Sequence, residues 1–124
     1  MALSTEMKVK LQAVITANEV TIPWVINPDE DLVKGLTEYL SKEPINMSPT
    51  DAKAQANEFL NKFDGKSSEA AQFLLDIAEN PKASALLDKA QGTEQYKQIS
   101  NTLIEHYQSG NLQTYLDNNQ PSQQ

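Results

Sequence analysis

The side chains best spaced for chemistry are the oxygen donors that follow Asn27. If Asn27 is counted as the first position, carboxylates occupy the third and fifth positions, and Glu38 occupies the twelfth. This is the spacing of the calcium loop in a helix–loop–helix site. However, the sixth position is Leu32, where that loop needs Gly, and Pro28 favours the start of a helix. We therefore interpret these acids as the first turn of a capped helix and expect no metal site here.

His106 is the only histidine of the chain and the only side chain whose ordinary pKa is near neutral. As a general base it would need an orienting partner and a nucleophile, and the sequence around it offers no serine in such a setting. As a metal ligand it would need carboxylates from elsewhere in the fold. We expect His106 to lie near the end of a helix, where a polar or cationic side chain is favourable.

The remaining reactive groups are carboxylates. Asp76 is seven residues after Glu69 and three residues before Glu79. Both separations return to the same face of a helix. Glycoside hydrolysis needs two carboxylates across a cleft, usually from different elements. Nothing in the pattern indicates burial, so we expect these three to be solvated.

Whole classes of site chemistry are excluded by composition. The chain has no cysteine, which rules out disulfides, thiolate catalysis and zinc–thiolate or iron–sulfur sites. Its four glycines are isolated, so no glycine-rich phosphate loop exists. We therefore expect no catalytic residue, no cofactor and no metal, and a protein that is not an enzyme.

The charge of the chain limits its partners. Its formal net charge is −7, and the ten basic residues are all lysines. Arginine supplies the planar donor fork that reads bases and clamps phosphates, and an acidic chain without it is poorly suited to nucleic acid or to an anionic membrane. The expected partner is another protein with a basic face. Glu6, Lys8 and Lys10 stand where a signal peptide has its apolar run, so we expect a soluble cytoplasmic protein.

Helix boundaries are the clearest local signals. Asn27, Ser48 and Asn80 each precede a proline, the pattern of a capping side chain followed by Pro at the first helical position. Gly65, Gly92 and Gly110 follow periodic runs, where they would end helices, and Thr93 would cap the next one. The apolar spacing predicts helices over 5–17, 28–40, 49–63, 68–78, 81–90 and 94–108, with a last turn over 112–116.

These elements predict an all-α fold. Short helices with tight joints favour a compact, irregular single-domain bundle of six or seven helices over a long parallel one. The proline-led starts are 21 and 32 residues apart, which excludes a repeat array. We expect one domain over 1–117, a flexible polar tail over 118–124, and an extended connector over 19–27.

The connector is β-branched, nearly uncharged, interrupted by Pro23, and carries Trp24, the only tryptophan. Its apolar side chains either fill the core between helices or form a strip that binds a partner, since tryptophan is typical of both. The second reading, joined to the acidic start of the next helix, predicts a protein-binding surface. Its members are Val20, Ile22, Trp24, Ile26, Asp29, Glu30 and Asp31.

The function that these patterns favour is a small acidic protein-binding or regulatory module, such as an inhibitor, an adaptor or an immunity-type protein. One alternative is a self-assembling structural subunit, for which a homodimer is the commonest arrangement. Another is a helical bundle that holds an apolar small ligand in a cavity. That cavity would lie among Trp24, Phe59, Phe63 and Phe73.

Overall fold

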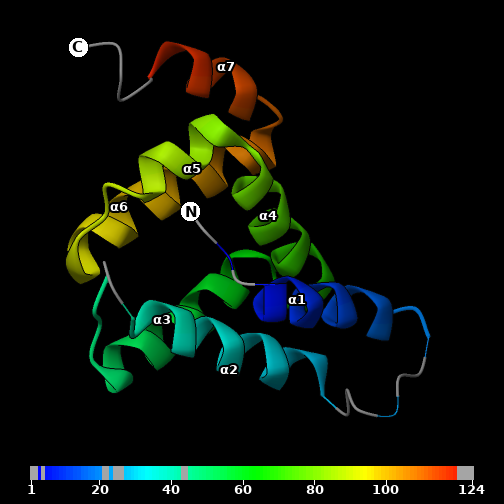
Figure 1. Cartoon of the computed structure of the whole chain (residues 1–124). Coiled ribbons are helices and arrows are strands. Elements are labelled where there is room, and N and C mark those ends of the chain that lie inside the picture. Colours follow the sequence, from blue (N-terminus) through cyan, green and yellow to red (C-terminus); the bar gives the residue numbers. More distant parts are fainter. Residues whose placement is uncertain (1–2, 4, 21–22, 24–26, 43–44, 120–124) are drawn as a thin grey trace.

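The chain is folded as packed helices (Figure 1). The structure is a computed structural model that describes residues 3, 5–20, 23, 27–42 and 45–119. In this part of the chain there are seven helices and no strand, which confirms the predicted all-α class. The helices are α1 (Thr5–Ala17), α2 (Pro28–Leu40), α3 (Pro49–Lys62), α4 (Ser67–Glu79), α5 (Pro81–Leu87), α6 (Gly92–Ser109) and α7 (Leu112–Asn118).

Three helices begin as the Asn/Ser-Pro pattern predicts. The side chains of Asn27, Ser48 and Asn80 each accept a hydrogen bond from a backbone N–H two or three residues ahead, at 3.0 to 3.3 Å. Each bond satisfies a donor that has no partner within its helix, and proline at the next position lacks that donor altogether. The bounds of α1 and α2 match the predicted ranges, α3 ends one residue earlier than predicted, and α4 extends one residue further at each end.

The joint between α5 and α6 corrects the prediction. α5 ends at Leu87 and not at 90, and Gly92 is the first residue of α6, not the cap of the helix before it. The cap residue of α6 is Gln91 and not Thr93, and its backbone N–H donates to the side chain of Gln95 at 2.9 Å. Ala90 is fully buried, so the chain must turn inward before the next helix can start. Local spacing could not reveal that turn.

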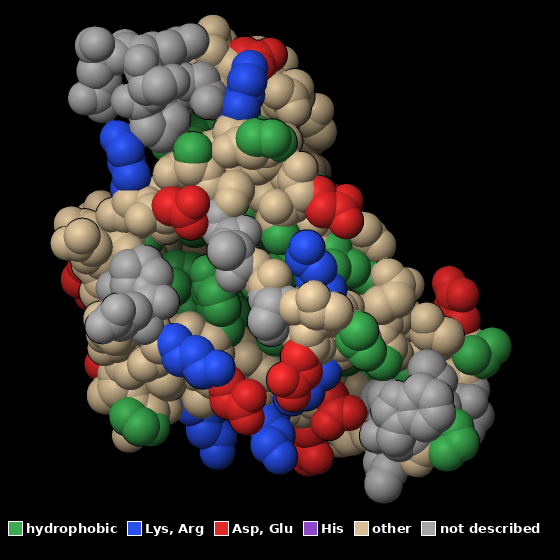
Figure 2. Space-filling model, in the orientation of Figure 1, with side chains coloured by type: hydrophobic (Ala, Val, Ile, Leu, Met, Phe, Trp, Pro, Cys, Tyr) green, Lys and Arg blue, Asp and Glu red, His purple; other side chains and the backbone are tan. Residues whose placement is uncertain are grey.

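The helices form two groups joined by α4. In the view of Figure 1, α1, α2 and α3 lie below, α5, α6 and α7 lie above, and α4 rises steeply from the lower group to the upper one. α4 packs against α1, α2, α3 and α5, and α3 also contacts α6. Figure 2 shows hydrophobic side chains in the central region between the two groups, while acidic and lysine side chains crowd the lower edge.

An aromatic cluster connects the two groups. Phe63, directly after α3, lies with its ring centroid 5.2 Å from Phe59 and 5.5 Å from Phe73 of α4. The ring of Phe73 in turn meets Tyr107 of α6 edge-on at 4.9 Å. Edge-on and tilted contacts at these distances are favourable. Trp24, the fourth residue of the expected ligand cavity, lies outside the described residues.

None of the described helices is both long enough and apolar enough to cross a lipid bilayer. α7 extends through Asn118, the first residue of the expected tail, and residues 120–124 lie outside the described part.

Replacing a core leucine tests the packing of this bundle. Leu36 is fully buried, so Leu36→Ala should lower the free energy of unfolding by about 2–5 kcal/mol. Val9 is 62% exposed, and Val9→Ala should change the free energy of unfolding by less than about 0.5 kcal/mol. Urea unfolding followed by circular dichroism measures both variants. Equal effects of the two would contradict the packing described here.

Buried tyrosines predict a loss of stability at alkaline pH. Burial raises the pKa of Tyr96 to about 12, although a hydrogen bond with Ser100 acts against the shift. Burial, helped by the Asp76 carboxylate, raises the pKa of Tyr107 to about 12 as well. In both cases the folded state favours the neutral phenol, so its advantage is complete below the unfolded pKa of about 10 and is lost as the pH rises to about 12.

The size of this effect can be isolated at Tyr96. A shift of this size on a buried group corresponds to roughly 3 kcal/mol, so Tyr96→Phe should lose about that much less stability than wild type across the interval, while Tyr107 acts equally in both proteins. The measurement is the urea midpoint as a function of pH. If the two proteins lose stability in parallel, the buried phenol is not the cause.

Candidate functional site

The predicted protein-binding surface is only partly described. Ile22, Trp24 and Ile26 lie outside the described residues. Val20 follows the end of α1 and is 57% exposed. The acidic residues form the first turn of α2, as expected, where Asp29 and Glu30 are exposed and Asp31 is half-buried.

The acidic turn opens into a groove between α2 and α3. The two helices run in roughly opposite directions, joined by the loop 41–48 (Figure 1). Between their outer faces lies a hollow of about 590 Å³. The residues that line it are Asp29, Glu30, Val33, Lys34, Thr37 and Glu38 from α2, and Lys53, Asn57 and Leu60 from α3.

The spacing of these residues explains why the groove is continuous. The α2 residues come as neighbouring pairs repeated every four positions, and the α3 residues are four and three apart, so each set lies along one helix face. From Asp29 to Glu38 the face extends for about 14 Å at 1.5 Å per residue. Beside these faces, the same helices carry Leu36 and Phe59, which are buried in the core.

The groove has an apolar centre and an uneven charge. Val33 is half-buried, and Leu60 is 8% exposed. The end at the first turn of α2 carries two carboxylates, Asp29 and Glu30. The rest of the lining carries two lysines against the single carboxylate Glu38, a net charge of +1. The groove is therefore negative at one end and weakly positive along the remainder.

The groove carboxylates are free to meet a partner. Within the described residues, the side chains of Asp29, Glu30 and Glu38 make no hydrogen bond or ion pair. A cation from another molecule could therefore bind them without breaking an internal contact. Sequence reasoning identified Asp29 and Glu30 but missed the contribution of α3, because no local pattern relates residue 30 to residue 60.

His106 lies in the last turn of α6, as predicted, and has a partner that the sequence analysis missed. Its Nδ1 donates to Oδ1 of Asn111 at 2.9 Å, and the hydroxyl of Ser109 donates to the same oxygen at 2.7 Å. The imidazole stacks on Tyr115 of α7 with the centroids 4.2 Å apart. Asn111 orients the ring, and the stack fastens α7 to α6.

The three spaced carboxylates have different surroundings. Glu69 and Glu79 are exposed, as expected. Asp76 is half-buried and accepts hydrogen bonds from Tyr107 at 3.0 Å and Gln72 at 2.9 Å, so it is less exposed than the other two. The approach of α6 to α4, which brings Tyr107 to Asp76, is a tertiary contact. In the described part of the chain, no cluster of three or more His, Asp or Glu side chains could hold a metal ion.

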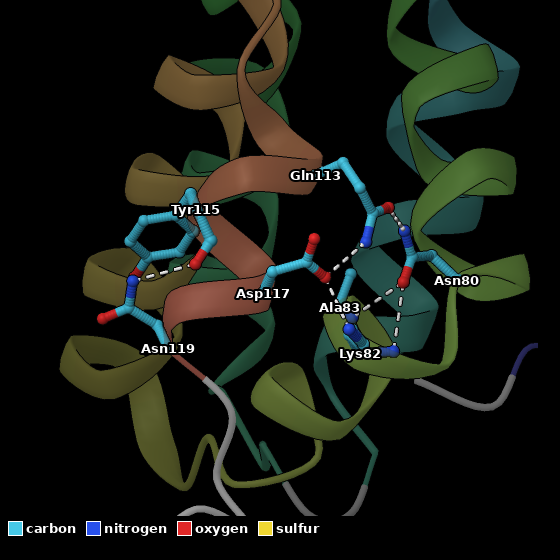
Figure 3. A network of polar contacts seen from close by, with 7 residues as sticks. All are labelled: Asn80, Lys82, Ala83, Gln113, Tyr115, Asp117 and Asn119. Atoms are coloured by element: carbon cyan, nitrogen blue, oxygen red, sulfur yellow. Dashed lines mark hydrogen bonds and ion pairs between the residues drawn. The ribbon is translucent and has the colours of Figure 1, made fainter.

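A polar network joins α7 to the start of α5 (Figure 3). Asn80, which caps α5, donates through Nδ2 to Gln113 at 3.3 Å, and Gln113 donates to Asp117 at 2.9 Å. Lys82 forms an ion pair with the same Asp117 oxygen. Hydrogen bonds from Lys82 and then from Gln113 hold the pKa of Asp117 below its ordinary value. We interpret this network as a fastening of α7.

Comparisons of the chain with protein-family models, with curated proteins and with solved structures found no match.

The α7 fastening can be tested with Asp117→Asn, which removes the charge and keeps the shape of the side chain. At neutral pH the backbone amides of α7 should exchange hydrogen faster than in wild type, and those of α2 and α3 should be unchanged. Because the pKa of Asp117 is lowered in the folded state, its contribution is present above the ordinary aspartate pKa of about 3.9 and is lost as the pH falls below it.

Wild type and Asp117→Asn should therefore converge in acid. Glu105→Gln, an exposed substitution on α6, serves as the control and should leave α7 exchange unchanged. Unaltered α7 exchange in Asp117→Asn would mean that the stack and the buried Leu116 hold the helix alone.

Proposed function

We propose that this protein is a non-enzymatic protein-binding module of the regulatory kind, such as an inhibitor, an adaptor or an immunity-type protein, and that it binds a basic face of its partner in the α2–α3 groove. The observation that carries this proposal is the meeting of free carboxylates with apolar side chains in one hollow. Asp29 and Glu30 are exposed and unpaired within the described residues, and they adjoin Val33 and Leu60.

The two kinds of side chain would have different roles in binding. Contact with Val33 and Leu60 would remove apolar surface from water and contribute affinity. The carboxylates would attract a basic partner, speed its approach and select its orientation. The net charge of −7 acts in the same direction at longer range.

The size of the groove favours a modest complex. The α2 side of the groove is about 14 Å long. Two helix faces of that length offer less contact area than the roughly 800 Å² per partner of a standard stable interface. Contact limited to the groove would therefore belong to the small interfaces of transient regulatory complexes. A tighter complex would need contacts beyond it.

Charge reversal tests the proposal. Asp29→Lys combined with Glu30→Lys should weaken partner binding by about tenfold or more, because two attractive charges become repulsive. Partners are first captured from an extract of the source cells and identified by mass spectrometry, and the partner is then titrated by calorimetry. Circular dichroism checks that the variant is folded.

The matched control is Glu94→Lys combined with Glu105→Lys, two exposed carboxylates of α6 outside the groove. It makes the same change in net charge and should retain most of the affinity. If both double variants bind equally well, the groove is not the binding surface. If wild type captures only copies of itself, the protein-binding function is replaced by self-assembly.

A further inference from the structure

We infer that the partner element bound in the α2–α3 groove is an amphipathic α-helix of about three turns, lying antiparallel to α2, with its basic end over Asp29 and Glu30. This inference rests on the proposed function and adds the class and direction of the ligand. It depends on three properties of the groove, which are the absence of competing recognition features, its length and its charge asymmetry.

The recurring ways of binding a peptide can be compared with this surface. Strand addition needs an open sheet edge, and every regular element in the described chain is a helix. Recognition of a proline-rich segment uses an aromatic-lined groove, and among the described residues that line this one there is no aromatic side chain. Recognition of a phosphorylated segment uses arginine clusters, and the chain has no arginine. A helix laid in the groove remains.

The length of the groove suits a helix. Its lining extends for almost three turns of α2, and a partner helix that places apolar residues at positions i, i+3 or i+4, and i+7 covers about 10 Å. Val33 lies near the middle of the α2 face, and Leu60 lines the same hollow from α3. The apolar stripe of the partner would therefore meet the apolar centre of the groove, with its charged ends over the charged ends of the groove.

The charge asymmetry selects the direction. Helices favour acidic side chains in their first turn and basic ones in their last turn. The last turn of the partner would lie over the two carboxylates at the start of α2, and its first turn over the remainder of the lining, where Lys34 and Lys53 outnumber the single carboxylate Glu38. The partner would then run opposite to α2. The reverse direction would place its acidic first turn against Asp29 and Glu30.

The first test uses a display library of helix-favouring peptides of about 14 residues, with the apolar stripe and both ends randomised. Selection on the folded full-length protein should enrich Lys or Arg in the last turn, Asp or Glu in the first turn, and large apolar residues at the stripe. Enrichment of proline-rich sequences, or the opposite end charges, would overturn the inference, as would a library that yields no binder.

The second test measures direction with one selected peptide. A nitroxide at the peptide C-terminus should broaden the amide signals of Asp29 and Glu30, and a nitroxide at its N-terminus should broaden that of Glu38. Asp29→Lys with Glu30→Lys should weaken this peptide by about tenfold, and a peptide with Glu in its last turn should recover the lost affinity. Glu94→Lys with Glu105→Lys is again the control.

Failure of this inference is separable from failure of the proposed function. If a cellular partner binds wild type but not the groove variant, while helical peptides show no end preference, the protein-binding function stands and the helical ligand is wrong. If the amide signals at both ends of the groove are broadened whichever peptide terminus carries the nitroxide, the fixed direction is wrong. If neither partner nor peptide depends on Asp29 and Glu30, both proposals fall.

Discussion

Six of the seven described helices have 14 residues or fewer, and burial of one apolar stripe per helix is the constraint on which the structure depends. Isolated helices below about 12–15 residues are marginal in water, and α5 and α7 have only seven residues each. Their stability must come from packing, as the complete burial of Ala83 and Leu116 indicates. α4 meets this requirement for the whole chain, because it contacts helices of both groups and contributes seven buried residues.

The same constraint creates the groove. Since α2 and α3 turn their leucine and phenylalanine stripes toward the core, their opposite faces must lie side by side at the surface. Polar contacts then fix where the helices stand. Asn18, just after α1, donates to Ser67 at the start of α4 at 3.1 Å, which joins two helices through a buried hydroxyl. The groove helices α2 and α3 are held by the burial of side chains such as Leu36 and Phe59.

The acidic turn of α2 has two physical roles that do not conflict. Three carboxylates in the first turn favour the positive end of the helix and help to define its start. Asp29 and Glu30 also project into the groove, where they remain without internal partners among the described residues. A feature that local stability explains can thus also present charge to another molecule. The groove geometry, and not the acidity alone, is what supports a binding function.

Interactions between residues close in the chain can be predicted from the sequence. The sequence by itself determined the all-α class, the three Asn/Ser-Pro helix starts, most of the apolar helix stripes and the sign of the net charge. Capping and periodicity act within a few residues, so they can be read directly. Only the tertiary structure decided three other features. These are the end of α5 at Leu87, the contact of Tyr107 with Asp76, and the presence of Asp29 and Leu60 in one groove. Each depends on which surfaces of distant helices fit together, and that fit arises from the packing of whole side-chain shapes, which no local spacing encodes.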